Sequence, residues 1–349
     1  MSQTIMCERT SDMFPNKVVA LLFAFTLVCC SVVAQTTPAA AQSPAAGQAP
    51  SPTANAVTPG SAPSAPDDTL PVQTFHSRSD EVNVIFTVTD KHNKFIKDLK
   101  ENQFKFLDNN RPPKQIMNFS AETDLPLRVG LLIDASNSIR DRFLFEQDAA
   151  IEFLHQIIRP KTDKAFVLAF DEVWDLTQDF TGDLDKLTKG VKVIRPGGGT
   201  ALWDAVFYAC RDKLMKERET GPVRRAIILV SDGDDNQSRV LRQEAIEMAQ
   251  RAGVIVYTIS TNLSSNPDEG DRSLKMLAET TGGQAFFPFK LQDVANAFHD
   301  IHEELRSQYS VFYKPEGFEA NGQFRPIQIA AENKKFRVRA KKGYYVPRQ

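Results

Sequence analysis

The stretch LRVGLLIDASNS, residues 127–138, joins an apolar run to a short polar loop. Val129–Ile133 is apolar at successive positions, as expected of a parallel strand that is covered on both faces. The loop Asp134–Ser138 follows where such a strand would open into a helix. In doubly wound folds the ligand binds at this edge of the sheet, outside the carboxyl ends of the strands. The stretch therefore predicts both a fold and the place of a site.

Similar apolar runs alternate with amphipathic segments farther along the chain. The predicted strands are Val129–Ile133, Ala165–Phe170, Ala226–Val230 and Val254–Ile259. The predicted helices are Arg142–Ile158, Leu184–Val193, Ala201–Lys216, Leu241–Ala252, Arg272–Thr280 and Leu291–Tyr309. Strands that alternate with helices are typical of α/β proteins. We therefore predict a Rossmann-like α/β domain over residues 124–309, with an open, mostly parallel, doubly wound sheet.

Shorter β patterns flank this domain on both sides. The predicted strands before it are Glu81–Asp90, Gln103–Leu107 and Gln115–Phe119, and those after it are Ser310–Tyr313, Phe324–Ala330 and Phe336–Tyr345. Neither group can bury a face alone, whereas together they supply about six strands, the usual number for an independent sheet. We predict that residues 72–123 and 310–349 form one smaller β unit.

The N-terminal region has the composition of an export signal and a spacer. Residues 1–34 contain an apolar run, Val18–Val33, that ends in small residues typical of a signal peptidase site. Residues 35–71 are rich in Pro, Ala and Ser, which predicts a disordered linker. The protein is then periplasmic or secreted, with no membrane span in the mature chain. An uncleaved signal anchor stays open as the alternative, because the run is near the lower limit of about 17 residues for a spanning helix.

Charge and cysteine content exclude several classes of protein. The formal net charge of −2 offers no basic surface for nucleic acid. Of the four cysteines, only Cys210 lies outside the predicted signal, so no intramolecular disulfide is expected.

Oxygen-bearing side chains gather at the predicted sheet edge. Asp134, Ser136 and Ser138 alternate along one loop, Thr200 follows a run of three glycines, and Asp232 ends the third buried run. Carboxylates and hydroxyls are hard ligands that suit Mg²⁺ or Mn²⁺, with Ca²⁺ as an alternative. The neighbouring Asp234 and Asp235 are interpreted as solvated loop residues.

This set resembles the metal-ion-dependent adhesion site of the von Willebrand factor type A (VWA) domain family, whose pattern is Asp-x-Ser-x-Ser, a later Thr and a later Asp. The resemblance implies that Ser136 and Ser138 bind the metal directly and that Thr200 binds it in the partner-bound state. Asp134 and Asp232 would act directly or through water. The flanking segments extend the resemblance to bacterial VWA-related proteins.

The resemblance implies a non-enzymatic adhesion or scaffold-type module. A partner protein would supply an Asp or Glu carboxylate to the metal. The residues alone leave two alternatives open: a Mg²⁺- or Mn²⁺-dependent hydrolase, and a metal-free structural or assembly protein of the cell envelope. All five histidines lie outside the metal loops, so no catalytic residue and no residue for an organic cofactor is predicted.

Export should remove about the first 34 residues and leave a new N-terminus near Gln35, because the small residues before it suit signal peptidase. Mass spectrometry of the mature chain tests this expectation. An intact Met1 in the membrane fraction would favour the signal anchor instead.

Overall fold

The computed structural model describes residues 81–122, 125–137, 143–217, 221–262 and 266–347. The predicted signal (1–34), the predicted linker (35–71) and Ser138 lie outside the described residues. None of the helices within the described ranges is long and apolar enough to cross a membrane.

A six-stranded sheet of order β6-β5-β4-β7-β8-β9 forms the centre of the α/β domain. Its strands are β4 (Leu127–Asp134), β5 (Lys164–Phe170), β6 (Trp174–Thr181), β7 (Arg224–Ser231), β8 (Ile255–Ser260) and β9 (Ala285–Phe286). Neighbouring strands run parallel except β5 and β6, which are antiparallel. The predicted open, mostly parallel sheet is confirmed. All eight residues of β4 are buried, which explains the apolar run in the sequence.

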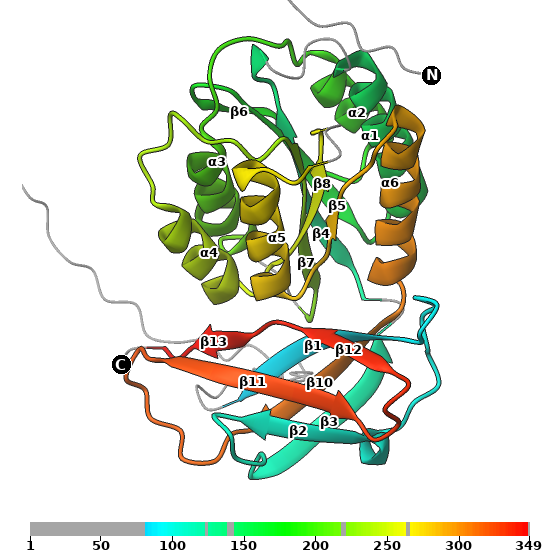
Figure 1. Cartoon of the computed structure of the whole chain (residues 1–349), viewed down its shortest axis with the longest axis vertical. Helices are drawn as coiled ribbons and strands as arrows, with labels where there is room; N and C mark the ends of the chain where they lie inside the picture. Colours follow the sequence, from blue (N-terminus) through cyan, green and yellow to red (C-terminus); the bar gives the residue numbers. More distant parts are fainter. Residues whose placement is uncertain (1–80, 123–124, 138–142, 218–220, 263–265, 348–349) are drawn as a thin grey trace, which may run out of the picture. The chain divides into compact units, whose positions relative to one another are not determined.

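Helices cover both faces of this sheet (Figure 1). One face carries α1 (Phe143–Ile157), α2 (Leu184–Lys192) and α6 (Leu291–Leu305), and the other carries α3 (Leu202–Tyr208), α4 (Arg242–Arg251) and α5 (Glu269–Thr281). A π-helical turn, Ala209–Leu214, continues α3. Each face has its own apolar core. The rings of Phe153 and Phe298, 4.9 Å apart between centroids, join α1 to α6 in the first core.

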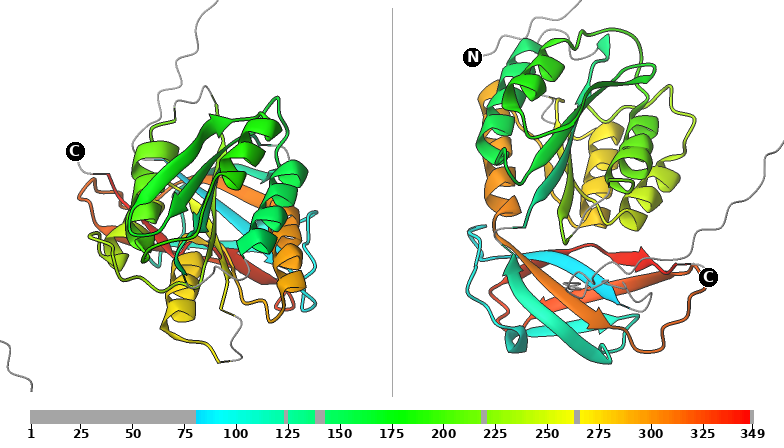
Figure 2. Two further views of the ribbon diagram at one scale, coloured as in Figure 1. Left: turned by 90° about the horizontal axis from the view of Figure 1, so that it is seen from above. Right: turned by 180° about the vertical axis from the view of Figure 1, so that it is seen from behind.

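Strands from both ends of the chain form two further sheets, of orders β12-β1-β10-β3 and β13-β11-β2. These strands are β1 (Val82–Thr89), β2 (Phe104–Asp108), β3 (Gln115–Glu122), β10 (Gln308–Lys314), β11 (Phe324–Ala331), β12 (Arg337–Ala340) and β13 (Gly343–Tyr345). N-terminal and C-terminal strands alternate in the first sheet, since β1 pairs with β10 and β12 and β10 also pairs with β3 (Figure 2). The predicted β unit built from both ends is confirmed.

A buried ionic centre joins the two halves of this β unit. Asp108, only 1% exposed, ends β2 and accepts hydrogen bonds from the hydroxyls of Tyr313 (2.8 Å) and Tyr344 (2.9 Å). Its other oxygen pairs with Nε of Arg325 at 2.6 Å. All three partners belong to C-terminal strands or their loops, so one N-terminal carboxylate holds several C-terminal elements.

A second buried carboxylate, that of Asp163, binds the chain where it enters and leaves the α/β domain. Its Oδ1 accepts the backbone N–H of Leu127 at 2.9 Å, at the start of β4. Its Oδ2 accepts Nη2 of Arg306 at 2.7 Å, directly after α6. Burial alone would raise the pKa of Asp163, but these hydrogen bonds and those from Arg159 hold the pKa below its usual value.

Two secondary-structure predictions need correction, and two strands of the central sheet, β6 and the two-residue β9, were not predicted. The helix predicted over Leu291–Tyr309 ends at Leu305, because the chain turns directly into β10 and the Tyr309 ring stacks on Phe86, 5.4 Å between centroids. The strand predicted over Phe336–Tyr345 is two strands, which pair with different partners, β1 and β11. Strand β6 was not predicted, since it lies at the sheet edge and has no buried residue.

Asp108→Asn should lower the stability of the β unit by about 3 kcal/mol, because the charge of Arg325 stays buried without its partner. Amide exchange should then become faster in β1, β2, β10 and β11. Glu319→Gln, which changes an exposed carboxylate on the same unit, is the control. Equal exchange in the two variants would show that the ionic centre does not stabilise the unit.

Candidate metal site

Three loops meet at the carboxyl-terminal edge of the central sheet. Asp134 is the last residue of β4, and Asp232 directly follows β7. Because β4 and β7 are parallel neighbours, with Ile133 opposite Val230, both carboxylates leave the sheet at the same edge. Thr200 lies in the loop that leads into α3.

Backbone hydrogen bonds fix these loops against one another. The N–H of Gly197 donates to the carbonyl of Ala135 at 2.6 Å, and the carbonyl of Thr200 accepts the N–H of Asn236 at 3.0 Å. The glycine loop is therefore held between the loops that carry Asp134 and Asp232. A Cβ on Gly199 would lie 2.7 Å from Oδ1 of Asn236, so a larger residue there would displace the side chain that accepts the N–H of Thr200.

Asp134 is fully buried, and both of its oxygens accept hydrogen bonds. The N–H of Ser136 donates to Oδ1 at 2.8 Å, and Oγ of Ser231 donates to Oδ2 at 2.6 Å. Burial raises the pKa of Asp134 to about 6. The negative charge of Asp232 also raises this pKa, whereas the hydrogen bonds from Ser231 and Ser136 lower it. A bound cation would offset the cost of two neighbouring carboxylates at a buried position.

The structure brings together four of the five predicted ligands, Asp134, Ser136, Thr200 and Asp232, on loops at one edge. Ser136 and Thr200 are each 3% exposed, whereas Asp232 is half-buried. The fifth, Ser138, lies outside the described residues. Two carboxylates and two hydroxyls form a hard-oxygen set, which fits a divalent ion such as Mg²⁺ or Mn²⁺.

The sequence interpretation missed side chains that support the site. Ser231 bonds to Asp134, and Oδ1 of Asn236 accepts the N–H of Thr200 at 3.0 Å. Asp235 was interpreted as solvated, which is wrong: it is half-buried, and its Oδ1 accepts the N–H of Leu202 at 2.9 Å. The identity of Ala201 could have indicated this role. Alanine at the N-cap of α3 cannot accept a hydrogen bond with its side chain, so the first N–H groups of the helix need acceptors from another loop.

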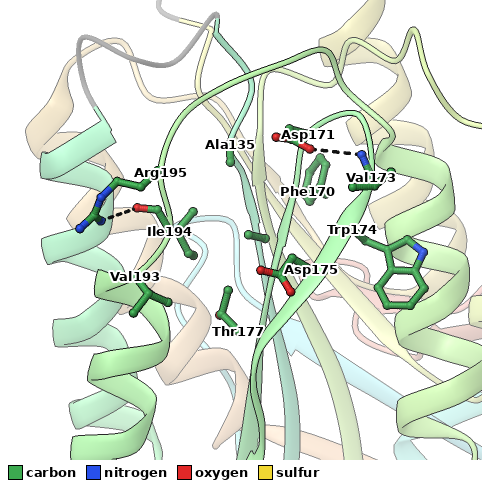
Figure 3. Close-up of a pocket in the computed structure, with 11 residues that line it drawn as sticks. Ala135, Phe170, Asp171, Val173, Trp174, Asp175, Thr177, Val193, Ile194 and Arg195 are labelled. Atoms are coloured by element: carbon green, nitrogen blue, oxygen red, sulfur yellow. Dashed lines mark hydrogen bonds between the residues drawn. The ribbon is translucent and has the colours of Figure 1, made fainter.

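A cavity of about 600 Å³ lies beside the metal loops. Figure 3 shows its walls, formed by the end of β4, the β5–β6 hairpin and the segment after α2. Ala135, between two predicted ligands, contributes to the lining, so this cavity adjoins the candidate site.

A family model for the von Willebrand factor type A domain matches residues 129–304. An uncharacterized protein of Borreliella burgdorferi is 22% identical over 239 residues, covering 63% of this chain and 65% of the relative. Human von Willebrand factor A domain-containing protein 3B is 29% identical over 163 residues, covering 45% of this chain and 11% of the relative. The chain thus spans less than two thirds of either relative. A solved von Willebrand factor type A structure from Catenulispora acidiphila aligns with a TM-score of 0.46 at 12% identity, over 78% of this chain and 74% of that one.

Asp134→Asn should abolish stabilisation by Mg²⁺ or Mn²⁺ without lowering the Tm in chelator, because it removes a desolvated charge beside Asp232. For the unmodified chain, an ion at about 100 times its Kd should add about 3 kcal/mol of stability. This corresponds to a Tm increase of roughly 5 °C. Differential scanning fluorimetry measures both effects.

Asp185→Asn, an exposed carboxylate on α2, is the matched control and should keep the full metal response. An equal metal response in Asp134→Asn and the control would refute the assignment of the site.

Proposed function

Because the chain belongs to the von Willebrand factor type A domain family, we propose that it is an exported, non-enzymatic protein-binding module of the adhesion or scaffold type. In this proposal a Mg²⁺ or Mn²⁺ ion at the three loops binds an Asp or Glu carboxylate of a partner protein. The observation that carries the proposal is the convergence of Asp134, Ser136, Thr200 and Asp232 at one edge of the sheet.

Each residue has a role that its surroundings support. Both oxygens of Asp134 already accept hydrogen bonds from the protein, which favours a contact to the ion through water. Ser136 and Thr200 would offer neutral hydroxyl oxygens, as would Ser138 from the family pattern. The ion then keeps much of its positive charge, and this charge attracts an anionic oxygen of the partner.

The loops favour binding over hydrolysis. Metal-assisted hydrolysis needs a group that moves a proton near the metal, and residues 134–138, 196–201 and 231–238 contain no histidine. Two of the carboxylates around the site have structural roles, since Asp134 is hydrogen-bonded on both oxygens and Asp235 caps α3.

The test compares the mature chain with Thr200→Val, which removes one hydroxyl and keeps the size of the side chain. Each immobilised protein is exposed to a cell-envelope extract in Mg²⁺, in Mn²⁺ and in chelator. We expect one partner to bind the unmodified chain at least ten-fold more in metal than in chelator, with this difference lost in Thr200→Val. The captured protein is then tested again after each exposed Asp or Glu is changed to the amide.

Other outcomes would contradict the proposal. Equal capture in metal and chelator supports the metal-free assembly protein instead. Turnover of phosphoester or acyl substrates that depends on Mg²⁺ or Mn²⁺ and is lost in Asp134→Asn supports the hydrolase. Retention of the partner after all its carboxylates are neutralised would refute the carboxylate contact.

A further inference from the structure

We propose that the cavity beside the metal loops holds a basic side chain, lysine or arginine, of the same partner segment that supplies the carboxylate. This inference rests on the proposed function and names the chemistry of the partner. The segment would carry one acidic residue for the metal and one basic residue within a few positions of it.

The cavity and the candidate metal site share their walls. Ala135 lines the cavity between Asp134 and Ser136, and its N–H donates to the carbonyl of Phe170 at 2.8 Å. On the other side, the N–H of Ala201, next to Thr200, donates to the carbonyl of Asp171 at 2.6 Å. A partner that reaches the metal would therefore lie at the mouth of the cavity.

Acidic groups line the side formed by the β5–β6 hairpin. Asp171 and Asp175 belong to the lining, and Glu172 lies between them in the sequence. Asp171 uses Oδ1 to accept the N–H of Val173 at 3.2 Å. Asp175 is exposed, and its carboxylate has no hydrogen bond or ion pair with the described residues. Its carboxylate is therefore available to a cation from outside.

The one basic residue of the lining, Arg195, is already engaged. Its Nη1 donates to the carbonyl of Lys192 at 2.6 Å and to that of Ile194 at 2.8 Å, at the end of α2. Figure 3 shows its guanidinium directed away from Asp175, whose carboxylate lies on the side of β6 that faces Val193 and Ile194. Arg195 therefore leaves Asp175 open to a second cation.

The rest of the lining suits the methylene stem of a lysine or arginine. Ala135, Ala169, Val193 and Ile194 present apolar surface, and Val193 is 57% exposed. Long basic side chains bury their stems on such surface and keep the charged group at a polar end. A wholly apolar side chain would fit the same walls but would leave two carboxylates without a counter-charge.

Charge around the metal loops also favours a mixed acidic and basic segment. Asp234, two residues after Asp232, is exposed, and the β5–β6 hairpin carries Asp171, Glu172 and Asp175. A segment with several carboxylates would be repelled by these groups, whereas one carboxylate at the metal beside one cation in the cavity is matched in charge.

The test uses nine-residue synthetic peptides on a Gly/Ser background with one central Asp. A single lysine, norleucine or glutamate is placed one to four positions before or after it. Norleucine keeps the length of the lysine stem without the charge. Binding to the mature chain is measured in Mn²⁺ and in chelator by ligand-observed NMR, which detects weak affinities.

At its best position, lysine should bind about five-fold more tightly than norleucine, the upper range for an exposed ion pair. Asp175→Asn should reduce this ratio to below two-fold, and Asp175→Lys should make glutamate the preferred residue. Asp185→Asn should leave the ratio unchanged.

The outcomes separate the two proposals. Metal-dependent binding with no preference for lysine, or a preference that survives in both Asp175 variants, overturns the basic subsite and leaves the metal function standing. If no peptide binds in Mn²⁺ more than in chelator, the proposed function and this inference both fail.

Discussion

The buried carboxylate of Asp163 fixes both points at which the chain crosses between the α/β domain and the β unit. It binds the N–H of Leu127 at the first residue of β4 and Arg306 just after α6. The position of β4 determines where Asp134 leaves the sheet, and the position of α6 determines where β10 begins. Burying a carboxylate is costly unless it is fully hydrogen-bonded, so this arrangement tolerates little displacement of either crossing.

A second buried network ties the end of α6 to both layers around it. Glu304, 1% exposed, accepts the hydroxyl of Tyr257 from β8 at 2.9 Å and pairs with Arg339 from β12. The same hydroxyl accepts Nε2 of Gln308 in β10 at 2.9 Å. Burial raises the pKa of Glu304, against the opposing effect of Arg339. A displacement of α6 would break all of these contacts at once. The position of the helix is therefore coupled to the positions of β10 and β12 in the β unit.

The fold was predictable because a strand that is buried on both faces of a sheet is apolar at successive positions. The apolar runs of β4, β5, β7 and β8 follow directly from their position inside the sheet. Edge strand β6 has no continuous apolar run, since its side chains are half-buried or exposed. The end of α6 was overestimated because Tyr309 continues the apolar pattern while its ring packs in the β unit.

Candidate ligands such as Asp134 and Asp232 were predictable because each lies where a buried strand ends, and the ends of parallel strands meet at one edge of the sheet. Their supports were not, because hydrogen bonds such as Ser231 to Asp134 or Asp235 to Leu202 join residues 97 and 33 positions apart. Local periodicity carries no information on such pairs. The cavity beside the site was equally hidden, since its walls come from three separate segments.

The interleaving of the two chain ends in the β unit imposes an order on folding. Asp108 meets Tyr313 across 205 positions and Arg325 across 217, and within the described residues strands β1 to β3 pair only with β10, β11 and β12, which are made after the α/β domain. The α/β domain, whose strands follow one another closely, closes its loops at lower entropic cost. The α/β domain is thus expected to form first and to bring the two ends together. The β unit then closes after the α/β domain.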